Sequence, residues 1–583
     1  MRPFKICSLR SAFGLSSGPR LYRCISITTS SGISSRRRKI TTKSTSTSSI
    51  VRMETIINNS RQLSSLPYTN CKTRIVSLKE LDLPETASDE EYREIYHRYI
   101  QSAETNANAA LLRDAVESIR HGLAPPVAFP TETVYGLGAD ATNEAAIQGI
   151  FAAKGRPSDN PLIVHAASVA HLERLTGERL PEIYRSLAQR FWPGPLTILL
   201  PVPQHSQSPS SWPRFAKNVH PGQSTIGFRI PSSKYARFFI AATDRPIAGP
   251  SANSSGKPSP TTAQHVFDDL KGKINFILDA GHCDVGVEST VVDGLHDPPL
   301  ILRPGGVSLA EFVAHGREQG NRFAYTAIGY KRHKRTGTPG QQQSLSPSPN
   351  SASPSASTSS STTSTASESS PAQQQDTTNH YLLNDDDDTE APRAPGMKYR
   401  HYAPKGRLIL FSEPAVRAGK VQTKFDELLA ETTTAAAQET GEKNINIGII
   451  SCHWASFAGL AGLSSPAQSS SSSVVSNSIY APLTSIATLT ETNNNVKVTV
   501  YDVRIGSDIK NLAHSLFGVL RLFDDLDCRF IFAETVQQQQ QSGLDGRNGS
   551  GNDSTSTSTT SCTRDIYDAV IDRIEKAAAE RVD

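Results

Sequence analysis

The chain has 583 residues, which is enough for more than one hydrophobic core, and its formal net charge is only +4. Such a small excess gives no overall argument for binding nucleic acid or a membrane, so any such surface must be local. No apolar run approaches the roughly 20 residues of a membrane-spanning helix. The seven cysteines form no CxxC pair, which indicates reduced thiols in an intracellular protein and argues against a structural zinc site.

The N-terminal segment is strongly basic, because its first 53 residues contain no Asp or Glu but many Arg, Lys, Ser and Thr. This composition is typical of an organelle transit peptide and equally of a disordered basic tail. Met53 offers a second start, which would give both an imported and a cytosolic form. We therefore expect residues 1–70 to be disordered and the protein to be cytoplasmic, with mitochondrial import as the open alternative.

Strand and helix patterns begin after this segment. A first strand and its exit are expected at Lys72–Leu81, and the polar, acidic stretch Pro84–Asn106 is expected to be a surface insertion with little function. Helical spacing then predicts one helix that starts at its cap Asn108 and a second at Ala145–Lys154.

Short apolar runs interleaved with helical patterns at 171–175 and 181–191 indicate an α/β sheet. The predicted strands are Val127–Phe129, Leu162–His165, Leu196–Val202, Thr225–Ile230, Ile247–Gly249, Ile274–Asp279, Ser289–Asp293 and Leu300–Leu302. Many of them end in polar clusters, and ligands bind at strand ends in α/β sheets.

Two loops in this sheet carry most of the chemistry. In the first, Thr131–Thr133 places hydroxyls and a carboxylate just beyond a strand, and Gly136 and Gly138 are expected to let the backbone approach a ligand closely. In the second, Lys154, Arg156, Ser158 and Asn160 stand on a proline-bracketed loop that suits a phosphate-bearing ligand.

Each of these residues also has a simpler interpretation. Lys154 and Arg156 could complement the dipole of the helix that ends there. His165 alone is more typical of a satisfied core histidine, and any single Ser or Asn of a turn or cap. Further cations and neutral donors nevertheless favour an anionic ligand such as a nucleotide. They are Arg229, Arg303, Thr133, Thr225, Ser251, Asn253, Ser259 and Ser289.

The remaining sequence predicts a second α/β unit after a low-complexity stretch. Residues 336–393 are mostly Ser, Thr, Pro, Gln and Asp and should be disordered. Strands are expected at Leu408–Phe411, Ile445–Ser451, Val496–Val503 and Arg529–Ala533, and helices at Ile509–Leu522 and Ile566–Ala579. Ser-rich and Gln-rich stretches at 464–478 and 537–561 are interpreted as loop expansions.

Six segments in a fixed order resemble the YrdC-type threonylcarbamoyl-AMP synthase family. They are PTETVYGLG, KGRPSDNPLIVH, GFRIP, SANSSGKPSPT, VEST and LRPG, and the later HYAP segment and C-terminal helices are similar to the family's long form. The resemblance implies a twisted α/β sheet domain with a ligand cavity at 71–335, a disordered linker at 336–393 and an active-site-closing linker motif at 394–404. A smaller Rossmann-like α/β domain would follow at 405–583.

The resemblance also implies the chemistry. L-Threonine, bicarbonate and ATP would give L-threonylcarbamoyladenylate and pyrophosphate, for N6-threonylcarbamoyladenosine formation in tRNA. Mg²⁺ would be held mainly by the ATP phosphates, and the product would pass to a tRNA threonylcarbamoyl transferase complex. Weak RNA binding remains an additional expectation, whereas a membrane partner is not expected.

Carried over by position, the family's site residues fall into three sets, with no protein metal ligand. The catalytic pair would be Lys154 and Arg156. Around threonine would lie Thr133, His165, Arg229, Gly249 and Ser289. Around ATP would lie Arg156, Asn160, Thr225, Ser251, Asn253, Ser259, Arg303 and Tyr402.

The family linker usually opens with Ser-Pro-Gly, whereas this chain has Ala394 there, so a contact from that serine hydroxyl is not expected. A hydrogenase-maturation carbamoyltransferase would bring paired zinc-finger cysteines and an acylphosphatase module, and the sequence has neither. A non-catalytic RNA-binding module, using cations such as Lys154, Arg156 and Arg229, remains the alternative.

Overall fold

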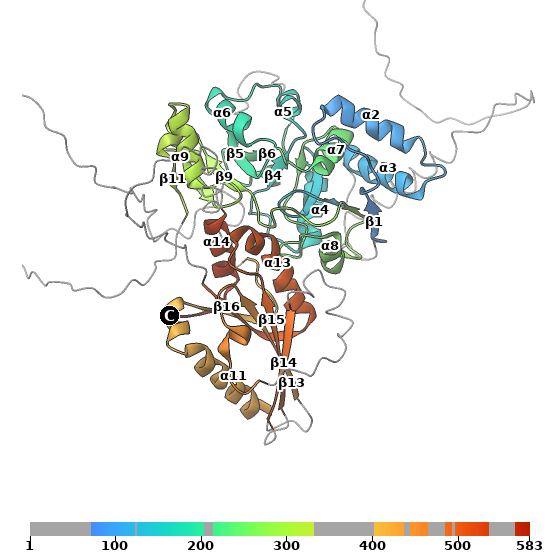
Figure 1. The fold of residues 1–583 in the computed structure, drawn as a ribbon. Helices are drawn as coiled ribbons and strands as arrows, with labels where there is room; N and C mark the ends of the chain where they lie inside the picture. Colours follow the sequence, from blue (N-terminus) through green and yellow to red (C-terminus); the bar gives the residue numbers. More distant parts are fainter. Residues whose placement is uncertain are drawn as a thin grey trace, which may run out of the picture. The chain divides into compact units, whose positions relative to one another are not determined.

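The computed structural model describes residues 71–122, 125–202, 214–330, 401–436, 443–463, 484–491, 496–535 and 566–583. The basic N-terminal segment, the predicted linker with Ala394, and the two predicted loop expansions at 464–478 and 537–561 lie outside these ranges. The described residues form two α/β regions (Figure 1). We call residues 71–330 the large-sheet region and residues 401–583 the small-sheet region.

The large-sheet region is built on one mixed sheet, in the order β1-β8-β2-β3-β7-β4-β6-β5-β9-β10-β11. Its strands are β1 (Arg74–Ser77), β2 (Val127–Phe129), β3 (Gly136–Asp140), β4 (Ile163–His165), β5 (Leu196–Pro201), β6 (Thr225–Arg229), β7 (Ile247–Ala248), β8 (Phe276–Asp279), β9 (Thr290–Asp293), β10 (Leu300–Arg303) and β11 (Ala327–Ile328). All eight strands predicted after residue 120 are present, within one or two residues.

Helices and short 3₁₀ turns connect these strands. They are α2 (Asp89–Ile100), α3 (Ala107–Arg120), α4 (Glu144–Lys154), α5 (Val169–Thr176), α6 (Glu182–Phe191), η2 (Lys217–Val219), α7 (Lys234–Thr243), α8 (Ala263–Leu270), α9 (Leu309–Glu318) and η3 (Arg322–Tyr325).

The prediction of a surface insertion at Pro84–Asn106 was wrong. Most of it is α2, which begins with a capping box between Ser88 and Glu91 and buries Tyr92 and Tyr96 against Phe238 of α7. Figure 1 shows α2 and α3 beside α7. The acidic composition concealed an amphipathic helix whose tyrosines follow helical spacing.

The expected cap of α3 was also wrong. Asn106, not Asn108, caps this helix, because its side chain accepts the backbone N–H groups of Asn108 and Ala109. Asn108 instead bonds to both the N–H and the C=O of Ser77, and so ties α3 to β1.

The two glycines after the first loop have a packing role that the sequence did not indicate. Gly136 and Gly138 lie in β3, which pairs with β2, and not in a loop. A Cβ atom at Gly136 would lie 2.8 Å from the Phe129 ring, and one at Gly138 would lie 3.0 Å from both Phe129 and Ile247. Their missing side chains therefore make room for the Phe129 ring.

The small-sheet region is a parallel sheet with one antiparallel edge strand, in the order β14-β15-β13-β16-β12-β17. Its elements are β12 (Arg407–Phe411), α10 (Glu413–Arg417), α11 (Lys420–Ala436), β13 (Lys443–Ser451), η4 (Ser456–Gly459), β14 (Thr484–Glu491), β15 (Val496–Arg504), α13 (Ile509–Asp525), β16 (Cys528–Glu534), α14 (Tyr567–Ala577) and β17 (Glu580–Val582). Apolar side chains of α13 and α14 pack on one face of the sheet, and those of α11 pack on the other. This three-layer arrangement confirms the predicted second α/β unit (Figure 1).

The longest helices, α11 and α13, have 17 residues each. Within the described ranges, none of the helices combines the length and the hydrophobicity that a bilayer crossing requires.

Candidate active site

Arg229 at the end of β6 is the centre of one polar cluster. The sheet register places it between His165 of β4 and Thr197 of β5. Its Nε donates to the Gly194 carbonyl (3.3 Å), one terminal nitrogen to Thr133 Oγ1 (2.9 Å), and the other to Glu132 Oε1 (2.6 Å). Two of the five guanidinium N–H groups are left after these bonds, which is the number that a bidentate carboxylate needs.

Glu132 is a member of this cluster that the sequence did not assign. Its side chain is 4% exposed and forms a buried ion pair with Arg229. The second carboxylate oxygen, Oε2, is buried and has no hydrogen-bond partner among the described residues. Glu132 is the one charged residue of Thr131–Thr133, which could have marked it as a site residue. Nothing in the sequence indicated its partner Arg229, 97 positions away.

The His165 imidazole is neutral in this setting. Burial, together with the nearby positive charge of Arg229, lowers its pKa to about 3. Its Nδ1 is buried without a hydrogen-bond partner in the described part of the chain, so the interpretation as a satisfied core histidine does not hold. A Cβ atom at Gly249 would lie 3.1 Å from this nitrogen, so the predicted Gly249 keeps space beside the ring.

Ser289 directly precedes β9, which is the strand on the far side of β5 from Arg229. Its Oγ lies 2.8 Å from Thr197 Oγ1, and a terminal nitrogen of Arg303 donates to both its carbonyl (2.9 Å) and its Oγ (3.2 Å). Thr197, fully buried in β5, was missed because a threonine inside an apolar strand carries no signal of its own.

Lys154 is the last residue of α4, but its ammonium group does not simply complement that helix. Its Nζ donates to the carbonyls of Ser251 (2.5 Å) and Asn253 (2.8 Å) and to Asn253 Oδ1 (3.3 Å). Burial and the neighbouring charge of Arg156 hold the pKa of Lys154 well below its usual range. Lys154 lies in the last turn of α4, as the dipole interpretation requires, and in addition it fastens the 251–253 segment to the second loop.

Arg156 and Asn160 each keep buried polar atoms without partners. A terminal nitrogen of Arg156 donates to the Pro161 carbonyl (3.3 Å), while its Nε and the Oδ1 of Asn160 have no partner among the described residues. Burial lowers the pKa of Arg156 to about 10, so the guanidinium remains charged at neutral pH. Buried donors and acceptors rarely stay unpaired in a folded protein, which is consistent with a ligand position here.

The remaining predicted ATP-side residues lie on neighbouring segments. Asn253 is 4% exposed, and its amide nitrogen donates to the carbonyls of Ser254 and Lys257. Ser259 is 1% exposed, and its Oγ donates to Glu288 Oε1 (2.6 Å). Glu288 is a second carboxylate that the sequence left unassigned, although it lies within the VEST segment.

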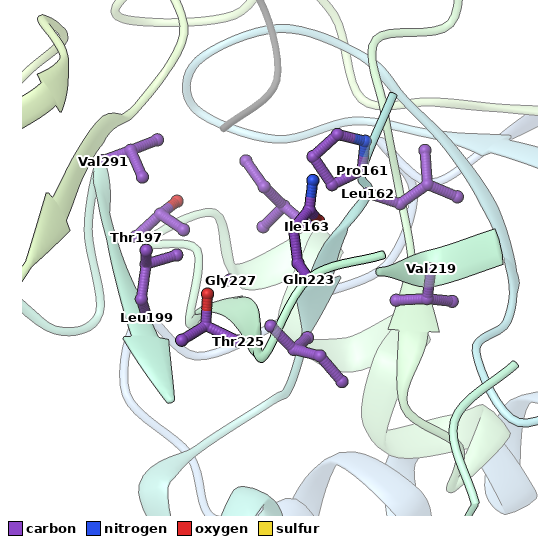
Figure 2. Close-up of a pocket in the computed structure, with 11 residues that line it drawn as sticks. Pro161, Leu162, Ile163, Thr197, Leu199, Val219, Gln223, Thr225, Gly227 and Val291 are labelled. Atoms are coloured by element: carbon purple, nitrogen blue, oxygen red, sulfur yellow. The ribbon is translucent and has the colours of Figure 1, made fainter. Parts of the chain in front are cut away.

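No hydrogen bond among the described residues brings the Thr225 side chain into either cluster. Thr225 begins β6, four residues before Arg229, and lines a small, mostly apolar cavity. Figure 2 shows Thr197, Leu199 and Val291 on one side of this cavity and Pro161, Leu162 and Ile163 on the other. The cavity thus borders both the strand of Thr197 and the loop of Asn160.

Tyr402 approaches the site from the small-sheet region. It is 4% exposed and has a φ of 65°, a left-handed conformation that is uncommon for tyrosine. Its ring packs against Phe517 of α13, with the ring centroids 5.2 Å apart. Burial raises the pKa of the Tyr402 hydroxyl, so it stays protonated.

Two family models match this sequence. One, described as "Telomere recombination", matches residues 124–305, and the other, described as "Threonylcarbamoyl-AMP synthase, C-terminal domain", matches residues 368–579. A threonylcarbamoyl-AMP synthase of Pyrococcus abyssi is 39% identical over 339 residues, which cover 58% of this chain and 76% of the relative. The chain belongs to the threonylcarbamoyl-AMP synthase family. The resemblance inferred from the six ordered segments is thereby confirmed.

Two other relatives match this chain over about a third of its length. Threonylcarbamoyl-AMP synthases of Schizosaccharomyces pombe and Bacillus subtilis are 51% and 50% identical, over 33% and 32% of this chain. The matched segments span about half of those two relatives, 50% and 52%. A crystal structure titled as P. abyssi Sua5 complexed with L-threonine is 29% identical, covers 88% of this chain and 100% of its own, and has a TM-score of 0.49.

Proposed function

We propose that this chain is an L-threonylcarbamoyladenylate synthase. L-Threonine and bicarbonate would form a carbamate on the threonine nitrogen with loss of water. A carbamate oxygen would then attack the α-phosphorus of ATP, break the bond to the β-phosphate oxygen and release pyrophosphate. The observation that carries this proposal is the presence of two adjoining buried polar clusters, around Arg229 and around Lys154 and Arg156, that keep unpaired polar atoms.

The Arg229 cluster would hold threonine. The two remaining guanidinium N–H groups suit the substrate carboxylate, and Glu132 and Thr133 fix the plane of the guanidinium in advance. The uncharged His165 ring adds no positive charge beside Arg229, and its Nδ1 offers a hydrogen bond to the ligand. Ser289 and Gly249 would complete the threonine side.

The cluster of Lys154 and Arg156 would hold ATP. Their positive charges can neutralise the charge that develops on the phosphate oxygens, which is where electrostatic catalysis of phosphoryl transfer acts. Asn160 offers a buried acceptor beside them. The other contacts would come from Thr225, Ser251, Asn253, Ser259, Arg303 and Tyr402. No protein nucleophile is required, because the carbamate is itself the attacking group.

Mg²⁺ would be bound mainly through the phosphates of ATP. In the ranges that the structure describes, no three carboxylate, histidine or cysteine side chains gather into a metal site. The Glu288 carboxylate accepts from Ser259, a predicted ATP residue, and from Arg573. Phosphate-held Mg²⁺ with few protein ligands is the arrangement expected for a nucleotide substrate.

The product would go to a tRNA threonylcarbamoyl transferase complex in the cytoplasm, and the basic N-terminal segment would add mitochondrial import. The non-catalytic RNA-binding alternative is weaker, because phosphate backbones are bound by exposed cations. Lys154 and Arg229 are each only 4% exposed, which favours a small enclosed anion.

The proposal is tested by omission of single substrates. The purified full chain should release pyrophosphate only when L-threonine, bicarbonate, ATP and Mg²⁺ are all present, and mass spectrometry should detect the threonylcarbamoyladenylate. Pyrophosphate release that does not depend on threonine would contradict the proposal. Salt-sensitive RNA binding without any adenylate formed would favour the alternative.

A further inference from the structure

Arg573 of α14 is a charged side chain with no exposed surface, in the small-sheet region. Its Nε donates to Glu288 Oε2 (3.0 Å), and its NH1 donates to the Pro304 carbonyl (2.7 Å) and to Asp572 Oδ2 (3.0 Å). Two of these three acceptors belong to the large-sheet region. The guanidinium therefore bridges the two regions through directional bonds.

Both large-sheet acceptors lie next to predicted site residues. Glu288 precedes Ser289 and accepts from Ser259 through its other oxygen, and Pro304 follows Arg303. Arg303 in turn bonds to Ser289. One guanidinium thus bonds to two segments that carry predicted ligand contacts and, through Glu288, is linked to a third that carries Ser259.

The same guanidinium lies over the ring of Tyr402, with its Cζ 5.6 Å from the ring centroid. Tyr402 packs against Phe517 as well, so α13 and α14 together hold it in its left-handed conformation. The position of the linker tyrosine therefore depends on Arg573.

Charge balance gives a further reason for an arginine here. Glu288 is a buried carboxylate among residues predicted to bind a polyanion, and it would repel phosphate if it were unpaired. Arg573 neutralises it from the small-sheet region, and the positive charge of Arg573 helps to hold the pKa of Glu288 below its usual range. A buried ion pair often stabilises a fold no more than apolar residues of similar volume would. We therefore interpret the pair of Arg573 and Glu288 as a positioning contact.

We propose that Arg573 is a positioning residue for ATP binding, so that the small-sheet region completes the nucleotide site of the large-sheet region. It acts by holding Glu288, the Pro304 carbonyl and Tyr402 in place, without forming a bond to the reacting atoms. The inference rests on the proposed function, since it assumes that this site binds ATP.

The test compares full-length wild type with Arg573→Ala and Arg573→Lys. ATP affinity is measured by calorimetry with a non-hydrolysable ATP analogue, and KM and kcat by pyrophosphate release. For Arg573→Ala we expect the dissociation constant and the KM for ATP to rise about 10- to 100-fold, as for other residues that orient a binding shell. The KM for threonine should change less than about fivefold, because the only threonine-side residue next to a segment that Arg573 holds is Ser289, which it reaches indirectly through Glu288. Arg573→Lys, which keeps the charge, should recover part of the affinity.

His514→Ala is the matched control. His514 also links the two regions, since its Nδ1 lies 3.1 Å from the Asp284 carbonyl and its ring packs on His282, but it contacts none of the predicted site segments that Arg573 holds. The ATP affinity of the His514→Ala variant should stay within about threefold of wild type. Equal losses of ATP affinity in His514→Ala and Arg573→Ala would show that ATP binding depends on the contacts between the two regions in general and not on Arg573. That result would overturn the proposal.

A double variant tests whether Arg573 acts through Glu288. If it does, Arg573→Ala combined with Glu288→Gln should lose no more ATP affinity than the worse single variant, whereas multiplied losses would contradict the proposal. If Arg573→Ala does not fold, Arg573→Lys decides, because a folded Lys variant with wild-type ATP affinity also overturns it. Binding of the analogue is measured without turnover, so failure of the proposed reaction and failure of the positioning role are distinguishable.

Discussion

The two α/β regions differ in how the buried acidic groups at their strand ends are paired, although the Nε1 of Trp454 in the small-sheet region also has no partner among the described residues. At the carboxyl ends of the small-sheet strands, Glu534 accepts the backbone N–H groups of Cys452, His453 and Trp454, and Asp502 accepts from Ser451 and Phe457. These two acidic groups are thus supplied with donors from within the region. The polar groups around Arg229 and Arg156 in the large-sheet region instead keep buried atoms without partners.

The carboxyl ends of the strands in an α/β sheet therefore do not by themselves make a ligand site. Parallel strands bring polar loops together in both regions, and this is where such folds bind ligands. In the small-sheet region the Glu534 carboxylate occupies the cluster of N–H groups that could otherwise bind an anion. We therefore place substrate chemistry in the large-sheet region and assign the small-sheet region a supporting role.

The largest effect is expected for the pair on the second loop. Lys154→Ala or Arg156→Ala should lower kcat for threonylcarbamoyladenylate formation about 1,000-fold or more, because in the proposed site Arg156 neutralises charge on the phosphates and Lys154 fastens the 251–253 segment beside it. Product formation is measured by mass spectrometry, and folding by circular dichroism.

Lys79→Ala is a suitable control for this prediction, because the Lys79 side chain is 55% exposed and pairs with Asp279, away from the predicted site residues. It should retain wild-type turnover. If Arg156→Ala unfolds the large-sheet region, Arg156 has a structural role instead.

A smaller effect is expected for Glu132→Gln, which keeps the shape of the side chain but removes its charge. The guanidinium of Arg229 would lose its charged partner at 2.6 Å, and its hydrogen bond to an uncharged amide oxygen would be weaker. The KM for threonine should rise about 10- to 100-fold and the KM for ATP about twofold at most. Steady-state kinetics with each substrate varied separately checks this, and an equal rise in both KM values would contradict the assignment of Glu132 to the threonine side.

The smallest effect concerns how the free energy of unfolding depends on pH. The folded-state pKa of His165 is about 3, whereas that of an unfolded histidine is about 6.5. Below pH 6.5 the unfolded chain binds a proton that the folded chain excludes, so the free energy of unfolding falls as the pH falls, until the pH reaches the folded-state pKa. His265 and His401, with pKa values lowered to about 3 and about 4, add to the same trend.

Replacement of His165 by Gln should therefore remove about 1.4 kcal/mol per pH unit from this slope between pH 6 and 4.5. Urea unfolding at several pH values measures the slope for both proteins. Identical slopes would show that His165 is not kept neutral by the fold.

The sequence predicted most of the strands and the two loops because apolar runs and proline punctuation are local signals, but it did not predict β11, β14 or β17. Nor did it predict β3, whose two glycines lack β-propensity and make sense only against the Phe129 ring. It also missed α2, although the Ser88 and Glu91 capping signal could have revealed that helix.

Residues that support the site were missed for a different reason. Thr197 meets Ser289 across 92 positions, and Arg573 meets Glu288 across 285 positions. No periodicity or motif connects residues so far apart, since only the sheet register and the packing of α14 bring them together. The ordered family motifs indicated which residues would contact ligands, but not the residues that hold them.

The most direct test of the comparison is to measure threonylcarbamoyladenylate formation by full-length wild type, Arg156→Ala and Glu534→Gln under identical conditions. We predict that Glu534→Gln keeps kcat within about twofold of wild type, because an amide oxygen can still accept the three N–H groups. Arg156→Ala should form no measurable product. The reverse pattern, with product lost in folded Glu534→Gln and retained in Arg156→Ala, would contradict the placement of catalysis in the large-sheet region.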